Sequence, residues 1–361
     1  MSERIAVAMS GGVDSSVAAA LLAEAGHDVV GVTLQLWDYS EANLAEGKGR
    51  CCSPADIADA RAVAAQVDFP HYVFDHTEHF REQIVEPFLD DYTAGLTPSP
   101  CISCNRHVKF DLLWRMAEAL GATRLATGHY VRIEDTDDRP RIHRAVDKDK
   151  DQSYFLFDVP RAQLGHVMFP LGHLDKNEVR DHARRLGLTV ADKPESFELC
   201  FIPDGDKDEF INRERPQEAG RPVSISGTDG ERMGTASGLH RYTIGQRKGL
   251  GVSSSQRLYV LDVAPETDTI VVGAEDGLYS SSLTAVRCNW VAIEAPTESL
   301  RVQAKIRHRH TPAEATLQPN SDGTYDVRFD DEQRAVTPGQ GVAFYDHGLL
   351  LGGGWIARAT P

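Results

Sequence analysis

Strand-like and helix-like segments alternate along the first half of the chain. An apolar run at residues 5–9 (IAVAM) leads through SGGVDSS into VAAALLAEAG, where Val17, Leu21 and Leu22 fall on one helical face. Further strand-like runs lie at 27–36, 71–75 and 123–130, and helix-like segments lie at 54–67, 78–91, 105–120 and 175–186. Strands that alternate with helices predict a parallel sheet covered on both faces, so we expect an α/β, Rossmann-like N-terminal domain.

Capping residues mark two of the predicted helix starts. Ser53 and Pro54 suit the N-cap and the first helical position of one helix, with Asp56 in its first turn. Asp175, followed three residues later by Glu178, forms a capping box that predicts another helix.

The pattern changes after about residue 205. Short β-rich runs are separated by Gly, Pro, Asp and Ser turns, among them RLYVLDV, TIVVG, LTAVRCNWVAI, RVQAKI and YDVRF. This pattern of short strand-like runs and turns predicts two small β-rich domains, the last of them a β-barrel. We therefore expect domains at residues 1–205, 206–277 and 278–361.

Charge limits the kinds of partner. The chain has 361 residues, with 38 Lys and Arg against 54 Asp and Glu, and a formal net charge of −16. Nucleic-acid affinity depends largely on Lys and Arg that displace phosphate counterions, so indiscriminate binding is disfavoured. A nucleic-acid partner needs local basic patches, and the segments RYTIGQRKG (241–249) and KIRHRH (305–310) supply them.

The sequence contains no membrane or export signal that we recognise. Its apolar runs fall far short of the ~18 residues of a membrane span, and the N-terminus lacks an apolar stretch of signal-peptide length. We therefore expect no membrane association and a cytoplasmic protein. In that compartment its six cysteines are thiols, metal ligands or catalysts rather than structural disulfides.

Residues 10–16 (SGGVDSS) join the first predicted strand to the first predicted helix. Backbone N–H groups and the helix dipole at such a junction can hold a phosphate, and two glycines let the backbone approach it. The segment is neither a GxGxxG fingerprint nor a GxxxxGK[ST] loop, because no lysine follows the glycines. It resembles the PP-loop of ATP pyrophosphatases, which split ATP between the α- and β-phosphates. By that resemblance Asp14 helps to position magnesium or pyrophosphate.

Two cysteine motifs are candidates for chemistry. Cys101 and Cys104 form a CxxC pair in TPSPCISCN, a proline-rich loop that leads into a predicted helix whose N-terminus would favour the thiolate. A CxxC pair alone suits zinc, redox chemistry or catalysis, and no second pair at zinc-site spacing is evident. Cys200 follows in PESFELCFIPDGD, and the polar, proline-containing flanks of both motifs favour a functional role.

Taken together, the motifs resemble those of one family. The series SGGVDSS, TPSPCISCN, ATGHY, DKDQSYFL, ESFELCFIPDGD, YTIGQRKGLG, KIRHRH and RAVTPGQGVAFY occurs in this order along nearly the whole chain. It resembles the bacterial tRNA-specific 2-thiouridylases, the MnmA family within the PP-loop ATP pyrophosphatases.

The resemblance implies an enzyme that replaces the C2 oxygen of the wobble uridine of certain tRNAs with sulfur. ATP, with Mg²⁺, adenylates that oxygen and releases pyrophosphate, which makes AMP the leaving group. Cys200 is implied to carry a persulfide received from a sulfur donor, either a cysteine desulfurase or a sulfur-relay protein. Cys104 is implied to be the partner nucleophile, and the two thiols can close as a Cys104/Cys200 disulfide.

The resemblance also implies three groups of binding residues. The ATP site would consist of Ala8, Met9, Ser10, Gly11, Gly12, Val13, Asp14, Ser15, Leu34 and Gly128. The target base would meet Ser99, Pro100 and Cys101. The other tRNA contacts would be His129, Lys150, Asp151, Gln152, Arg307, His308 and Gln340.

Cys101 departs from some family members, which carry an Asp at this position that has been cast as a general base. Base catalysis at this position therefore cannot be assumed. The thiols of Cys101, Cys104 and Cys200 could instead hold a [4Fe–4S] cluster with an open fourth iron, which leaves a cluster-dependent thiolation open beside the persulfide route. We assign no other metal site.

Two alternatives of other kinds remain open. One is another PP-loop adenylating ligase or amidotransferase, which needs no paired reactive cysteines. The other is a non-catalytic tRNA- or nucleotide-binding module with β-rich appendages.

Overall fold

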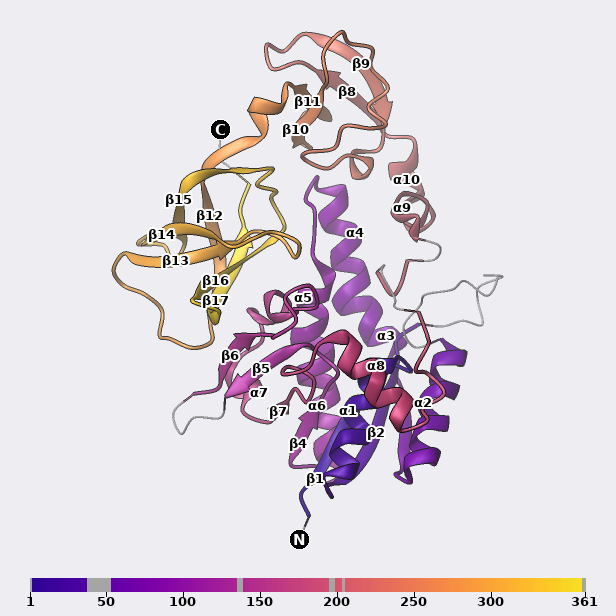
Figure 1. Cartoon of the computed structure of the whole chain (residues 1–361). Coiled ribbons are helices and arrows are strands. Elements are labelled where there is room, and N and C mark those ends of the chain that lie inside the picture. The colour runs from indigo at the N-terminus through magenta and orange to yellow at the C-terminus, as the bar shows by residue number, and fades with distance from the viewer. Residues whose placement is uncertain (1, 38–52, 135–138, 195–198, 203–204, 359–361) are drawn as a thin grey trace.

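The computed structural model describes residues 2–37, 53–134, 139–194, 199–202 and 205–358 (Figure 1). The adjacent cysteines 51 and 52 lie outside the described residues. In the described residues, no helix is long and apolar enough to cross a membrane.

The N-terminal part is a five-stranded parallel sheet with the strand order β3-β2-β1-β4-β7. Its strands are β1 (Arg4–Ala8), β2 (Asp28–Gln35), β3 (His71–Asp75), β4 (Arg124–Ala126) and β7 (Val167–Met168). The helices α1 (Val13–Glu24), α2 (Pro54–Val67) and α8 (Lys176–Arg185) accompany them, together with the short α7 (Arg161–Leu164) and the 3₁₀ turn η3 (Ser153–Leu156). The predicted α/β domain is confirmed.

The position of β1 determines where a ligand can bind. The central residues of β1 are fully buried, and β1 lies between β2 and β4. The chain builds outward from β1 to β2 and β3, then returns to place β4 on the other side. Open parallel sheets bind ligands at such a switch point, outside the carboxyl ends of the strands.

Local sequence signals determine where the helices begin. Ser53 and Asp56 form a reciprocal capping box at the start of α2, with Pro54 in the first turn. Asp175 and Glu178 form the same arrangement at α8. Both predicted helix starts are confirmed. The strand predicted at 123–130 is shorter than expected, because β4 ends at residue 126 and the chain then leaves the sheet.

Two long helical stretches follow β3. The first contains α3 (Thr77–Phe80), the π-helical turn η1 (Arg81–Val85) and α4 (Glu86–Thr93). The second contains α5 (Pro100–Cys104), the π-helical η2 (Asn105–Leu112) and α6 (Leu113–Ala119). It begins five residues before the predicted start at 105, so the CxxC pair lies on the helix itself and not in the loop before it.

The second half is built from strands, as predicted. After α9 (Lys207–Glu214) and α10 (Pro216–Ala219), a four-stranded sheet has the order β10-β11-β8-β9. Its strands are β8 (Pro222–Ser226), β9 (Arg232–Ser237), β10 (Tyr259–Ala264) and β11 (Thr269–Gly273), with the 3₁₀ turn η5 (Leu239–Arg241) between β9 and β10. This central domain has a hydrophobic cluster of its own.

The C-terminal domain is a closed six-stranded antiparallel barrel. It follows the 3₁₀ turn η6 (Glu275–Leu278) and consists of β12 (Tyr279–Trp290), β13 (Leu300–Lys305), β14 (Ala313–Pro319), β15 (Tyr325–Arg334), β16 (Gly341–Asp346) and β17 (Leu349–Ile356). The barrel closes because β12 pairs with both β15 and β17. The predicted barrel is therefore confirmed.

A hairpin from the N-terminal half extends the barrel sheet. Strands β5 (Val131–Glu134) and β6 (Arg141–Arg144) pair with each other, and β6 pairs with β17 through His143 and Leu349. The sequence analysis did not predict this pairing. Figure 1 shows the barrel lying beside α5 above the parallel sheet. The hairpin thus joins the barrel to the domain that carries both candidate motifs.

Candidate active site

The glycine loop lies between β1 and α1, where the sequence placed it. Ser10 N–H donates to the Ser15 hydroxyl at 3.2 Å, and the Ser15 and Ser16 hydroxyls donate to the Gly12 carbonyl. Gly12, the N-cap residue of α1, has no side chain with which to cap the helix. The amides of the first turn therefore remain directed toward a ligand site, which favours an anion.

Two glycines allow a close approach of backbone segments here. Gly11 has φ +72°, and a Cβ on it would contact the Asp56 carbonyl oxygen and lie 2.6 Å from its carbonyl carbon. Gly128, just after β4, would place a Cβ 2.7 Å from the Ser15 nitrogen. Leu34 is buried near the end of β2. The predicted ATP residues therefore gather at the carboxyl ends of β1, β2 and β4, at the switch point of the sheet.

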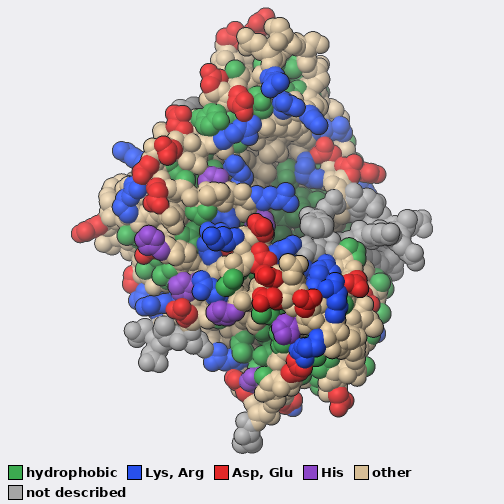
Figure 2. Space-filling view, in the orientation of Figure 1, with side chains coloured by type: hydrophobic (Ala, Val, Ile, Leu, Met, Phe, Trp, Pro, Cys, Tyr) green, Lys and Arg blue, Asp and Glu red, His purple; other side chains and the backbone are tan. Residues whose placement is uncertain are grey.

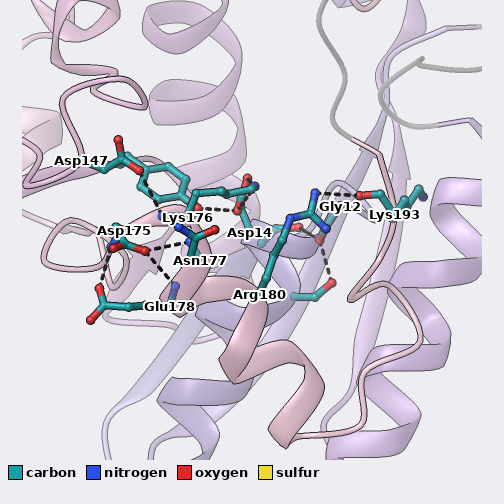
Figure 3. Close-up of polar contacts among 12 residues, drawn as sticks. Gly12, Asp14, Asp147, Asp175, Lys176, Asn177, Glu178, Arg180 and Lys193 are labelled. Atoms are coloured by element: carbon teal, nitrogen blue, oxygen red, sulfur yellow. Dashed lines mark hydrogen bonds and ion pairs between the residues drawn. The ribbon is translucent and has the colours of Figure 1, made fainter.

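Asp14 is held on one side of this loop. It accepts a hydrogen bond from the Tyr130 hydroxyl at 2.7 Å, and the Lys176 Nζ lies 2.7 and 2.9 Å from its two carboxylate oxygens. Lys176 begins α8, and its backbone N–H donates to Asp147 at 3.1 Å. Figure 3 shows the Lys176 side chain extending from α8 toward Asp14. An ammonium group thus stands beside the first turn of α1.

Lys193 occupies the other side of the loop. Its Nζ donates to the Gly11 carbonyl at 2.9 Å, to Asp56 at 2.6 Å and to Asp59 at 2.5 Å. Partial burial lowers the pKa of Lys193, but the hydrogen bonds to the two carboxylates more than offset this and the pKa is raised. Arg180 of α8 donates to the Lys193 carbonyl and fixes the backbone at this point (Figure 3).

Sequence reasoning missed both lysines. It noted that no lysine follows the glycines within the loop, whereas the structure brings lysines to the loop from residues far along the chain. Lys176 directly follows the N-cap Asp175, and Lys193 lies seven residues before Cys200. A signal was therefore present, since each lysine adjoins a motif that the sequence analysis had already selected.

The cysteines lie at different depths. Ser99 occupies the N-cap position of α5, and Pro100 its first turn. Cys101 is exposed, whereas Cys104 is 8% exposed and belongs to the central hydrophobic cluster. Cys200 is half-buried and packs against the same cluster. The structure therefore associates Cys104 and Cys200 with one cluster and leaves Cys101 at the surface.

The proposed set of cluster ligands is not assembled. Among the described residues, no group of three or more His, Cys, Asp or Glu side chains is arranged to hold a metal ion. Within that part of the chain, Cys101, Cys104 and Cys200 do not form the preformed set that a [4Fe–4S] cluster needs. The geometry therefore does not support the cluster-dependent alternative.

Cys288 differs chemically from the other described cysteines. It lies on β12, and burial together with the nearby Asp158 raises the pKa of its thiol to about 12. It therefore remains protonated near neutral pH and is a poor nucleophile.

A surface pocket lies beside α5. It is small and partly open to solvent, and it is lined by Ser99 and Pro100, two of the three residues implied to meet the target base. The rings of Phe88 and Trp355 also line it. Phe88 is buried against other aromatic rings, so the half-buried Trp355 is the ring of this pair that could contact a nucleobase.

The implied tRNA contacts lie in different environments. His129 is 7% exposed, with its Nδ1 2.7 Å from the Thr127 hydroxyl and its Nε2 3.4 Å from Lys109. Burial, and then the charge of Lys109, lower the pKa of His129, so its ring is neutral near pH 7. The Gln152 side chain accepts from the Tyr130 N–H at 3.0 Å, which places residues 150–152 next to this histidine.

Residues 150–152 also meet the barrel. Asp151 is buried and accepts from Arg144 Nε at 2.9 Å. The His308 ring packs on Phe155 with ring centroids 4.7 Å apart, and His308 interacts with the backbone of Asp151. Two of the implied tRNA-contacting groups, 150–152 and 307–308, therefore come together where the N-terminal domain meets the barrel.

Family comparisons agree with this architecture. Residues 3–204 match the tRNA methyl transferase HUP domain, and residues 208–274 match the tRNA methyl transferase PRC-barrel domain. Residues 280–356 match the aminomethyltransferase β-barrel domain. The fold and the site thus define a HUP-domain protein with a PP-loop and two β-rich appendages.

Sequence relatives specify the family. The chain is 49% identical to the tRNA-specific 2-thiouridylase MnmA of Solibacter usitatus (strain Ellin6076), over 98% of each chain. It is 46% identical to the protein of the same name in Geotalea uraniireducens (strain Rf4), over 99% of this chain and 96% of the relative. The chain belongs to the tRNA-specific 2-thiouridylase (MnmA) family of enzymes, and the resemblance inferred from the motif series is confirmed.

Proposed function

We propose that this enzyme is a tRNA-uridine 2-sulfurtransferase, which thiolates C2 of the wobble uridine at the expense of ATP. One observation carries the proposal. A glycine loop flanked by two lysine ammonium groups lies in the same domain as Cys104 and Cys200, which share one hydrophobic cluster. The first feature suits the binding of a polyphosphate, and a pair of thiols in the same domain is what sulfur transfer through a persulfide needs.

The residues present fit ATP and Mg²⁺. The glycine loop and the first turn of α1 would hold phosphate oxygens, with Lys176 and Lys193 balancing their charge. Mg²⁺ prefers oxygen ligands and commonly uses one or two carboxylates plus substrate phosphates, so Asp14 would supply such a ligand. The bound ion would offset the negative charge on departing pyrophosphate.

Adenylation is needed because a uracil carbonyl oxygen is a very poor leaving group. The uridine O2 attacks the α-phosphorus of ATP, pyrophosphate leaves, and AMP then becomes the group that departs from C2. In the second step the Cys104 thiolate attacks the Cys200 sulfur of the persulfide and displaces its terminal sulfur. That sulfur replaces the oxygen at C2, AMP leaves, and a Cys104–Cys200 disulfide remains for a thiol reductant to reopen.

The tRNA would lie across the domains. On the face in Figure 2, Lys and Arg side chains border a hollow below the central domain at the top of the view. Such local positive charge is what a tRNA-binding protein of net charge −16 requires. The expected contacts at 150–152, 307–308 and Gln340 belong to this interface, with the target base beside residues 99–101. The other partner would be a persulfide donor, and we expect the enzyme to work in the cytoplasm, with tRNA.

Mass spectrometry of nucleosides tests the proposal. We would incubate tRNA with the protein, Mg-ATP and a persulfide-generating desulfurase, and compare wild type with Cys200→Ala. Cys288→Ala is the matched control, because that thiol is buried and its pKa is raised. We expect wobble 2-thiouridine from wild type and from Cys288→Ala, and none from Cys200→Ala or without ATP.

Other outcomes would count against the proposal. If ATP is cleaved to AMP and pyrophosphate but no 2-thiouridine forms, the protein is a PP-loop adenylating enzyme with another substrate. Unchanged thiolation by Cys200→Ala would remove the persulfide role from that residue.

A further inference from the structure

The segment that leads into the CxxC pair is held by the C-terminal barrel. Thr97 N–H donates to the Pro338 carbonyl at 3.0 Å. The Gln340 side-chain amide donates to the Thr97 carbonyl at 2.8 Å and to the Pro98 carbonyl at 3.4 Å. Residues 338–340 lie in the connection between β15 and β16, more than two hundred positions away in the sequence.

The two segments also fit closely. Gly339 has φ +86°, and a Cβ on it would lie 2.9 Å from the Leu96 Cβ and 3.0 Å from the Thr97 nitrogen. A Cβ on Gly341 would lie 2.8 Å from the Cδ1 of Ile102, which is on α5 between the two cysteines. The barrel loop therefore follows the cysteine segment from residue 96 to residue 102 with little space between them.

A second attachment secures the start of the same segment. Arg358, just after β17, donates to the Gly95 carbonyl at 3.0 Å and also to the carbonyl of Val263 in the central domain. A Cβ on Gly95 would lie 2.9 Å from the Cγ1 of Val263, so the central domain also contacts the chain ahead of the cysteines. α5 is the first part of the helical stretch that continues through η2 and α6, so the entering chain acts on the turn that carries Cys101 and Cys104.

We propose that Gln340 is a positioning residue for the CxxC pair. Its two hydrogen bonds set the path of residues 97–98, and this path sets α5 so that Cys104 is buried in the hydrophobic cluster while Cys101 faces solvent. The effect on turnover rests on the proposed function, whereas the effect on the thiols does not. A role in tRNA contact alone would leave Cys104 unchanged in the free protein.

Asn289 offers a matched control. It is also a barrel side-chain amide, half-buried like Gln340, and donates to two carbonyls of the N-terminal domain, Phe157 at 2.7 Å and Val159 at 3.0 Å. Its contacts lie away from residues 96–99. Loss of either amide removes two contacts of the same kind between the same two domains, but of the two only Gln340 donates to residues 97–98.

The test compares Gln340→Ala, Gln340→Glu and Asn289→Ala with wild type. The rate at which iodoacetamide alkylates Cys104 in the free protein is followed by peptide mass spectrometry, beside the melting temperature and the kcat and KM for tRNA thiolation. Gln340→Glu keeps the size of the side chain but loses the N–H donors, so it separates hydrogen bonding from packing. We expect similar losses of melting temperature in Gln340→Ala and Asn289→Ala.

Only the two Gln340 variants should alkylate faster at Cys104, by about tenfold, and lower kcat by at least that factor. If Cys104 alkylates at the wild-type rate in both Gln340 variants, or as fast in Asn289→Ala, the positioning role is wrong. A change in KM alone would also overturn it and leave Gln340 as a tRNA contact. If wild type makes no 2-thiouridine but the alkylation rates differ as expected, the proposed function fails while the positioning role stands.

Discussion

Replacing Gly11 by alanine should destabilise the N-terminal domain, because two separate costs coincide at this residue. Its φ of +72° is left-handed, which costs an alanine about 1–2 kcal/mol. The new Cβ would also lie 2.6 Å from the carbonyl carbon and 2.7 Å from the Cα of Asp56, and these backbone atoms cannot rotate away. Overpacking of this kind costs about 1–3 kcal/mol, so we expect a total of about 3 kcal/mol.

The melting temperature of the protein without ATP is the measurement. For a domain of about 200 residues, ~3 kcal/mol corresponds to a fall of about 6–12 °C. Gly12→Ala is the control in the same loop, because its φ is −90° and its nearest new contact is the Ser10 hydroxyl at 3.5 Å. That variant should melt within about 3 °C of wild type. Equal melting temperatures for the two variants would refute the argument from backbone conformation and close approach.

Two further changes test the electrostatics of the domain. Lys193→Met removes the ammonium group that contacts Asp56, Asp59 and the glycine loop, so we expect ATP-dependent pyrophosphate release to fall at least tenfold. Lys148→Met is the control, because Lys148 is exposed. Equal rates for the two variants would contradict the role of Lys193. Burial, and then Arg61, lower the pKa of His71 from 6.5 to about 4. The unfolded chain therefore binds the proton more readily between these values, and stability falls as pH drops from 6.5 toward 4, by about 2 kcal/mol after the full shift is reduced for solvent screening of the half-buried ring. His71→Gln should show a smaller loss of melting temperature between pH 7 and pH 4.5, and an identical pH dependence would show that His71 does not titrate in this window.

Local signals in the sequence predicted the features that depend on near neighbours. The glycine loop, the capping boxes of α2 and α8, and the alternation of strands and helices all involve residues within a few positions of one another. Hydrophobic periodicity and capping chemistry act over this range, and so these elements were predictable without any knowledge of tertiary contacts.

Contacts between distant segments were not predictable in the same way. Lys176 and Lys193 reach the glycine loop from more than 160 residues away, and β6 pairs with β17 across some two hundred residues. A single sequence does not indicate which distant residues will pair, because packing in the folded protein determines the partner of a strand edge or of an ammonium group. The domain boundaries and the residue roles in tRNA binding remain predictions for the same reason.

The distribution of contacts suggests how the two halves of the reaction are separated. The groups around the glycine loop, including Asp14, Lys176 and Lys193, all come from the N-terminal domain. The entry to the cysteine segment contacts instead Gln340, in the barrel loop between β15 and β16, and Arg358, just after the last barrel strand. Substitutions in the barrel can therefore alter the position of the cysteine thiols relative to a bound base without disturbing the phosphate site. If the β-rich domains carry the tRNA, as we propose, the contacts that hold the tRNA also orient the residues that deliver sulfur to it.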